Sequence, residues 1–302
     1  MNEPSGVLIV DKHTGLTSHD IVGKVRRLYG TRRVGHTGTL DPDASGVLVV
    51  LIGRAAKAAE YLASDTKRYR ARLRLGITTD TEDATGSVLT ECADIPDAAA
   101  VIDACARFVG DIKQIPPMYS ALKKDGQKLC DLARRGIVVE REARDVTIHE
   151  LICTPTDTST DYILDVFCSS GTYIRTLCAD IGASLGCGGI MAELRRVEAG
   201  GFSIDSSHTI CDIEKLSDEE RISLLSPVES LFDTLPKVCL SQFFEKLCRS
   251  GCEIYQKKIG TAHPTGQRVR ICDDSGRFFA LGEVGEYEGG SAIKAIKTFE
   301  LK

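Results

Sequence analysis

The clearest pattern along the chain is the strict alternation in KRYRARLRL, residues 67–75. Apolar or aromatic side chains alternate there with four arginines, as on a strand that turns one face to a core and the other away from it. Four arginines on one strand face are tolerated when they are solvated on an antiparallel sheet or when they face an anion such as phosphate. The alternation predicts the strand and leaves both environments open.

Several other segments predict strands and helices in alternation. The apolar runs GVLIV, VLVVLI and DYILDVFC indicate buried strands at residues 6–10, 47–52 and 161–168. Thr17-Ser18-His19-Asp20 resembles a capping box that opens a helix, and YIRTLCADIGASLG has the apolar spacing of a second helix ending at Gly186. These elements favour an α+β fold.

The carboxyl end reads as a small separate module. Residues 211–235 hold seven acidic and two basic residues, and this acidic stretch marks a boundary. Beyond it, SQFFEKLCRSG predicts a short helix, and RVRICDDSGRFFALGEV predicts a hairpin with Asp-Asp-Ser-Gly as its loop. We therefore expect a domain over residues 1–232 and a β-rich module over residues 233–302, which suits a chain of 302 residues.

Composition excludes several classes of protein. The amino terminus lacks the basic region and cleavage site of a signal peptide, and no apolar run approaches the roughly 20 residues of a membrane helix. We therefore expect a cytoplasmic protein with no membrane partner. The twelve cysteines include no C-x-x-C pair, so small buried side chains are favoured over metal ligands and no metal is expected.

Charge is distributed unevenly along the chain. The net charge is −5, yet residues 1–74 hold 13 Lys or Arg against 7 Asp or Glu. A basic first third within an acidic protein suggests a local surface for a polyanion. Residues 123–135 form a second basic segment after Pro-Pro, either a projecting arm or an ordinary loop and helix.

The loop in RVGHTGTLDPDASGVLVVLIG carries the first candidate for chemistry, Asp41. Asp-Pro is first of all a turn former, and a turn alone would explain it. The surrounding glycines allow close backbone approach to a ligand, and the apolar strand that follows would hold the carboxylate in place. A carboxylate in that setting can act as a nucleophile or a base. His36, in the same loop, is either structural or a ring that reaches into nucleic acid.

Two further positions are site candidates because of where they fall on predicted elements. Tyr173 and Arg175 lie off the apolar stripe of their helix, next to the end of a strand. Tyr69 begins the apolar face of its strand, where a core tyrosine is the default interpretation.

Four motifs together resemble one family. VGHTGTLDPDASGVLVV, KRYRARLRLG with TDTED, IPPMYSALK and SSGTYIRTL occur in this order and closely resemble the bacterial TruB family of tRNA pseudouridine-55 synthases, over about residues 6–202. The resemblance implies the pseudouridine-synthase fold, a mixed and mainly antiparallel sheet with flanking helices. It also implies an RNA-binding insertion at about residues 76–145 and a PUA-like carboxy-terminal module that binds RNA.

The resemblance also implies a reaction and the residues that carry it. The family isomerises uridine 55 in the T loop of tRNA, breaking the glycosidic bond and rejoining the base through C5, with no cofactor. The resemblance implies that Asp41 is the catalytic carboxylate, that the ring of Tyr69 packs on the target base, and that Arg175 pairs with the carboxylate. Substrate-binding positions are expected at His36, Tyr173, Leu194 and Lys12, and RNA-backbone contacts at Arg68, Arg70, Lys123 and Lys124.

Two residues depart from the family pattern: His13 stands where Pro is usual, and Asp43 adds a second acid near Asp41. Three interpretations remain open: a stand-alone monomeric tRNA enzyme, the related guide-RNA-dependent enzyme, and an RNA-binding protein or tRNA chaperone without catalysis. The segment QIPPMYSALK argues against the second, so no guide RNA is expected. Asp41, Tyr69 and Arg175 together argue against the third, since binding alone does not need this combination.

Overall fold

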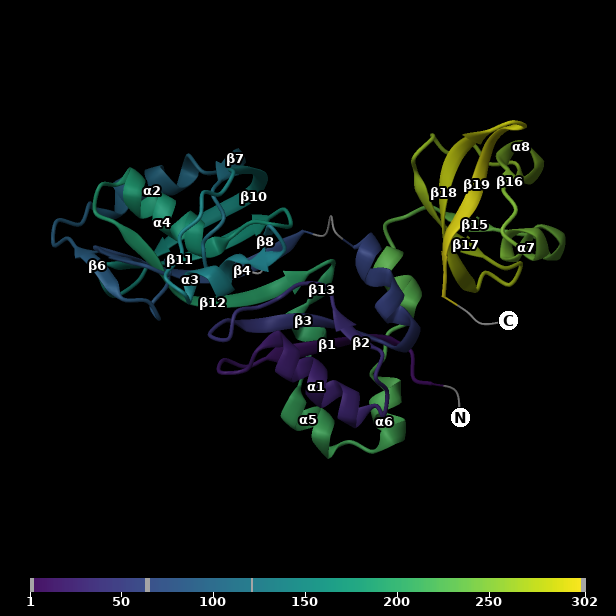
Figure 1. The fold of residues 1–302 in the computed structure, drawn as a ribbon, viewed down its shortest axis with the longest axis horizontal. Coiled ribbons are helices and arrows are strands. Elements are labelled where there is room, and N and C mark those ends of the chain that lie inside the picture. Colours follow the sequence, from purple (N-terminus) through teal and green to yellow (C-terminus); the bar gives the residue numbers. More distant parts are fainter. Residues whose placement is uncertain (1–2, 63–65, 121, 300–302) are drawn as a thin grey trace.

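The computed structural model describes residues 3–62, 66–120 and 122–299. These residues build a large mixed sheet with flanking helices and, at the carboxyl end, a smaller curled sheet (Figure 1). The predicted α+β class and the mainly antiparallel sheet are therefore confirmed.

The large sheet has ten strands in its described part, in the order β14-β1-β3-β12-β4-β11-β10-β7, with β13 beside β12 and β2 beside β3. The pairs β1–β14 and β12–β3 are parallel and the other pairs are antiparallel. Its strands are β1 (Gly6–Lys12), β2 (Val34–His36), β3 (Ser45–Ile52), β4 (Lys67–Leu75), β7 (Gly110–Gln114), β10 (Arg144–Pro155), β11 (Asp161–Cys168), β12 (Gly189–Ala199), β13 (Phe202–Ser203) and β14 (His208–Thr209).

Helices cover this sheet and connect its strands. The predicted capping box is present at Thr17, where α1 begins. The Ala-rich segment after β3 winds as a 3-10 helix. The α-helices of this part are α1 (Ser18–Leu28), α2 (Ala98–Ala106), α3 (Leu129–Ala133), α4 (Ile174–Ser184), α5 (Ile210–Lys215) and α6 (Asp218–Ser223), and the 3-10 helices are η1 (Gly53–Tyr61), η2 (Ile204–Ser206) and η3 (Val228–Phe232).

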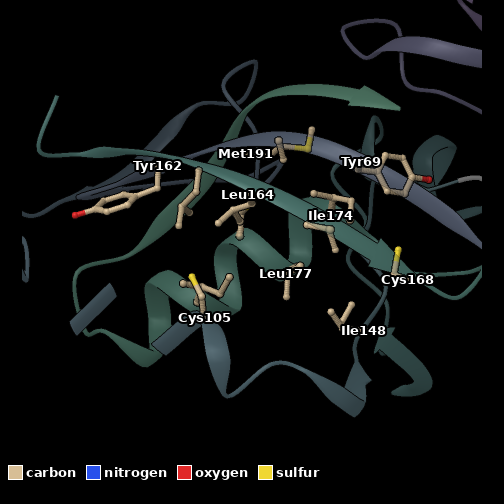
Figure 2. Close-up of a cluster of buried hydrophobic side chains, with 14 of the residues drawn as sticks. Tyr69, Cys105, Ile148, Tyr162, Leu164, Cys168, Ile174, Leu177 and Met191 are labelled. Atoms are coloured by element: carbon tan, nitrogen blue, oxygen red, sulfur yellow. The ribbon is translucent and has the colours of Figure 1, made fainter. Parts of the chain in front are cut away.

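One apolar core lies between α2, α4 and the strands β4, β10, β11 and β12 (Figure 2). The alternation of residues 67–75 is realised as predicted, since Ala71, Leu73 and Leu75 are buried and Arg70 and Arg74 are exposed. Tyr69 and Tyr162 lie at opposite ends of this core in the view of Figure 2. Tyr69 is therefore a core residue at the edge of the core.

The insertion predicted at residues 76–145 is partly built into this core. Val101 and Cys105 of α2 pack within it, and β7 forms the sheet edge beside β10. Two small hairpins project from the same segment, β5 (Ile77–Thr79) with β6 (Val88–Glu91) and β8 (Lys123–Lys124) with β9 (Gln127–Lys128). Residues 123–135 thus form a hairpin followed by a short helix.

The carboxy-terminal module is a five-stranded sheet in the order β15-β17-β18-β19-β16. The predicted short helix and the hairpin are both present. Its elements are β15 (Lys237–Cys239), α7 (Gln242–Arg249), β16 (Ile254–Tyr255), α8 (Gln256–Ile259), β17 (Arg268–Cys272), β18 (Phe278–Tyr287) and β19 (Gly290–Thr298).

The module is attached to the large domain through apolar packing. Phe278 and Phe299 stack on each other and pack against Phe232 of η3 with tilted rings, and this group is continuous with Val7 and Val49 on one face of the large sheet. The predicted boundary near residue 232 therefore lies beside the core that joins the two parts. Among the described residues, no helix is long and apolar enough to cross a lipid bilayer.

Strand β12 joins the two halves of the large sheet. At one point Arg196 lies opposite Tyr69 of β4 and opposite Gly46 of β3. Gly46 has φ of +102°, and a Cβ built there would lie 2.1 Å from the carbonyl oxygen of Arg196. Only glycine fits this backbone conformation and this close approach.

Gly46→Ala should therefore destabilise the protein strongly, by about 3 kcal/mol or more, because both the backbone conformation and the contact with β12 become strained. Urea unfolding followed by circular dichroism measures the change. Gly23→Ala is the matched control: no atom lies within 4 Å of a Cβ at this position of α1, so it should be neutral or stabilising. Equal stability of the two variants would contradict the tight junction.

Candidate active site

The Asp41 loop, residues 37–44, connects β2 to β3 and is held at successive backbone groups. The Leu40 amide donates to Ser18 Oγ at 2.9 Å, and Ser18 Oγ donates to the Leu40 carbonyl at 3.1 Å. The Ala44 amide donates to the Asp41 carbonyl, and the Gly15 amide donates to the Pro42 carbonyl. A loop rich in glycine is thereby fixed by its neighbours, and the carboxylate of Asp41 projects from a defined position.

Arg175 faces Asp41 from the first turn of α4. Its Nη2 lies 3.0 Å from Asp41 Oδ2, and its side chain is only 7% exposed, against 44% for Asp41. The predicted pair is therefore present in the structure. The guanidinium also donates to the carbonyls of Thr81 and Tyr119, so its orientation is fixed by groups other than its acidic partner.

Asp83 is a further member of this group that the sequence did not single out as a site residue. Its Oδ2 lies 3.8 Å from Arg175 Nε, while its Oδ1 accepts hydrogen bonds from Thr81, from the Thr85 amide and from the Thr85 hydroxyl. Asp83 thus ties the turn after β5 to the arginine. The TDTED motif contained the signal, but its cluster of acids gave no indication of which one faces Arg175.

Tyr69 lies on the core face of β4, in the same apolar cluster as Leu40 and Ala44 of the Asp41 loop, with 7% of its surface exposed. Burial raises the pKa of the Tyr69 hydroxyl, and the nearby charge of Asp41 acts in the same direction, while the charge and hydrogen bond of Arg196 oppose them. The ring is therefore protonated at neutral pH and presents a flat apolar surface beside Asp41.

Two other predicted positions lie on elements next to this centre. Tyr173 precedes α4, where its amide and carbonyl are both hydrogen-bonded to the side chain of Gln114, and burial raises the pKa of its hydroxyl. Leu194 is half-buried against the core, directly opposite Ala71 and so on the Tyr69 side of the sheet. Tyr173 is thus near enough to Asp41 and Arg175 for their charges to act on its hydroxyl, and Leu194 lies on the face of the sheet that carries Tyr69.

His36 lies at the end of β2, where the Asp41 loop begins. Its ring is 6.2 Å from that of His19 in an edge-to-face arrangement. Burial lowers the pKa of His36, and its Nδ1 has no hydrogen-bond partner among the described residues. The ring is neutral at pH 7, so it can enter a stack of bases at a lower desolvation cost than a charged ring.

Lys12 has a different position from the one expected of a substrate-binding residue. Its side chain is fully buried, and Nζ donates to the carbonyls of His13, Leu16 and Pro42. All three donor positions of the ammonium are used within the protein. Lys12 therefore supports the Asp41 loop from inside. The two departures, His13 and Asp43, are both exposed.

The arginine face of β4 is largely neutralised by acids on neighbouring strands. Arg68 lies 2.6 Å from Glu150 and 3.0 Å from Asp165. Arg74 binds Asp161 through two nitrogens, and Arg72 lies near Asp161 and Glu193. Arg70 is the most exposed, 3.7 Å from Asp165.

This face is also opposite to the one that carries Tyr69, because successive strand residues point to opposite sides of the sheet. The expectation that Arg68 and Arg70 contact the RNA backbone therefore has little support from the structure. Lys123 and Lys124 are exposed on the β8–β9 hairpin, as RNA contact requires, and Lys124 also donates to the Glu140 carbonyl.

No group of three or more His, Cys, Asp or Glu side chains within residues 3–62, 66–120 and 122–299 is arranged to hold a metal ion. The cysteines form no disulfide in this part of the chain, and eight of them are buried or half-buried in the apolar cores.

Known proteins that match this chain identify its family. The model of the TruB family pseudouridylate synthase N-terminal domain matches residues 26–174, and that of the tRNA pseudouridylate synthase B C-terminal domain matches residues 175–233. The tRNA pseudouridine synthase B of Clostridium perfringens strain SM101 is 40% identical over 93% of this chain and 96% of its own length. That of Alkaliphilus oremlandii is 43% identical over 88% and 89%. The chain belongs to the TruB family.

Solved structures support the fold of this TruB family member. The structure titled as a Cbf5-Nop10-Gar1 complex aligns with a TM-score of 0.76 and 26% identity over 98% of this chain and 85% of that one. The structure of an H/ACA RNP bound to a substrate RNA has a TM-score of 0.75 at 24% identity and shows the shared fold alone. The resemblance seen in the motifs is thus confirmed, and the protein is an isomerase that makes pseudouridine.

Asp83→Asn should lower the rate of pseudouridine formation about 10-fold while RNA affinity stays the same. The change removes the charge that helps orient Arg175 but keeps an oxygen for the turn, and misplacement of a catalytic partner acts on the rate. Single-turnover rates and filter-binding constants measure the two effects.

Asp80→Asn is the matched control for this prediction. Asp80 lies in the same turn and accepts from the Ser87 amide, and no described contact joins it to Arg175. It should retain the parent rate. A similar loss in both variants would show that the turn, and not the charge of Asp83, is what matters.

Proposed function

We propose that this protein converts uridine 55 in the T loop of tRNA to pseudouridine, acting alone as a monomer in the cytoplasm, without a guide RNA and without a cofactor. The observation that carries the proposal is the Arg175–Asp41 ion pair, with Tyr69 close enough for the charge of Asp41 to act on its hydroxyl. It agrees with the names of the relatives, each a tRNA pseudouridine synthase B that aligns over nearly the whole chain.

The target base must leave the stacked T loop before it reaches Asp41, which costs a few kcal/mol. The ring of Tyr69 supplies a stacking surface, and stacking of a base on an aromatic side chain is worth about 1–3 kcal/mol. Tyr173 and Leu194 are proposed to contact the bound base, and the neutral ring of His36 is proposed to fill the gap that the base leaves in the RNA.

Asp41 is the group that begins the chemistry. Its carboxylate is half-exposed, while the guanidinium that faces it is buried and fixed by two carbonyls. The charge of Arg175 balances that of Asp41, and the paired arrangement aims one carboxylate oxygen at the bound nucleotide. Glycosidic cleavage and rejoining through C5 then use the same bound base, so no group has to be supplied from outside.

Removal of the C5 proton completes the reaction, and Tyr69 is the proposed participant. Because burial raises the pKa of its hydroxyl, Tyr69 enters the reaction protonated. The step is a net proton shift within the base, since C5 loses a proton and N1, released from the sugar, gains one. The Tyr69 hydroxyl can accept the C5 proton only if it passes on its own proton at the same time, and Asp41 is the nearby carboxylate whose charge acts on it.

Affinity for the T arm is proposed to come from the β8–β9 hairpin and the helix after it. Lys123, Lys128 and Arg135 line one hollow there, together with Asp131. This segment leaves the site at Tyr119, whose carbonyl binds Arg175, so phosphate contacts on the hairpin would connect directly to the catalytic group. The carboxy-terminal module is proposed as a second, PUA-like RNA-binding surface.

Asp41→Asn should abolish pseudouridine formation, by about 10³-fold or more, while tRNA affinity is retained. An unmodified tRNA transcript is incubated with purified protein alone, and pseudouridine is mapped along it. The parent protein should modify position 55 and Asp41→Asn should not.

Asp43→Asn is the control for this experiment, because Asp43 is an exposed acid two residues away. It should retain activity. A transcript that is bound but never modified by the parent protein would refute catalysis and favour a binding role. Modification that requires an added RNA would refute the stand-alone enzyme.

A further inference from the structure

Arg196 is a buried arginine with no acidic partner within ion-pair distance among the described residues. Its side chain is among the largest that are fully buried, with 1% of the residue exposed. A guanidinium has five N–H donors and keeps its charge at any physiological pH, so its burial requires acceptors. Its acceptors are backbone carbonyls on both sides of Asp41.

Three hydrogen bonds join Arg196 to the two ends of the Asp41 loop. Nη2 donates to the Gly38 carbonyl at 3.0 Å and Nη1 to the Thr39 carbonyl at 3.4 Å. Nε donates to the Val47 carbonyl on β3 at 2.7 Å. A single rigid, planar group therefore spans the loop from the residues before Asp41 to the strand after it.

The same side chain adjoins Tyr69. Arg196 and Tyr69 are direct partners across β12 and β4, so their side chains leave the same face of the sheet. The charge of Arg196 also acts on the Tyr69 hydroxyl, where it opposes the rise in pKa that burial causes. Arg196 thus contacts the structures that present both proposed catalytic groups, and it needs no contact with RNA to do so.

We propose that Arg196 is a positioning residue for the isomerisation, which sets the distance between the Asp41 carboxylate and the Tyr69 ring by fixing the Gly38–Thr39 backbone. The effect of Arg196 on catalysis rests on the proposed function. Its role in holding the Asp41 loop rests on the three hydrogen bonds alone. Lysine cannot reproduce the planar fork, and methionine fills a similar volume with no donor.

The test compares Arg196→Lys and Arg196→Met with Arg195→Met in the full chain. Arg195 is the matched control because it is the adjacent residue of β12 and its side chain points to the opposite face of the sheet. There it binds Asp11 and Ser45. Single-turnover rates at saturating tRNA should fall about 10-fold for Arg196→Lys and about 100-fold for Arg196→Met, since small displacements of reacting groups have effects of that size. The tRNA dissociation constant should stay within about twofold, and Arg195→Met should keep the parent rate.

Amide hydrogen exchange provides a measure that does not depend on activity. Residues 37–44 should exchange faster in both Arg196 variants, while β4 and β12 keep their protection. Parent-like rates, or faster exchange spread evenly over β3, β4 and β12, would overturn the inference. If the parent protein forms no pseudouridine, the proposed function fails, and exchange in residues 37–44 still decides whether Arg196 holds the loop.

Discussion

The site depends on buried cations that bind backbone carbonyls around one exposed carboxylate. Lys12 holds Pro42 from one side of the Asp41 loop, and Arg196 holds Gly38 and Thr39 from the other. Removing a charge from water is costly unless every donor finds an acceptor, so each cation permits few alternative loop conformations. The loop therefore has a fixed conformation although its glycines would allow many. Because the buried cations need these carbonyls as acceptors, the backbone on both sides of Asp41 stays in place.

Sheet topology explains how distant segments reach this point. Strand β12 pairs with β3 in parallel and with β4 in antiparallel orientation, and at Arg196 it touches both. Arg196 therefore contacts both the Asp41 loop after β2 and the strand β4 that carries Tyr69. Arg175 is added from α4, whose packing on the core of Figure 2 fixes the direction from which it meets Asp41. The three side chains come from a loop, a strand and a helix, and each of these segments is part of the same sheet, joins two of its strands or packs against it.

Sequence patterns predicted those features that depend on neighbours along the chain. The period of two in residues 67–75 predicted the strand and its buried face, and the capping box predicted the start of α1. Asp41, Tyr69 and Arg175 were found through family motifs, and the structure brings Asp41 and Arg175 within 3.0 Å. The roles of Lys12, Asp83 and Arg196 depend on carbonyls and carboxylates far away in sequence, and no local pattern specifies such partners. The same limit applies to the arginine face of β4, because Asp161 and Asp165, which neutralise it, lie some 90 residues further along the chain.

The arrangement of charges also separates binding from chemistry. On β4 the arginines are satisfied by acids, so that side of the sheet offers a nucleic acid little free positive charge. The lysines of the β8–β9 hairpin are exposed, and β8 begins four residues after Tyr119, whose carbonyl accepts a hydrogen bond from Arg175. Phosphate contacts on the hairpin would also restrict the backbone at Tyr119, which binds the Arg175 guanidinium, because only a short stretch of chain separates the two. Such contacts would help to keep the Arg175 guanidinium, which two carbonyls already fix, in its place beside Asp41.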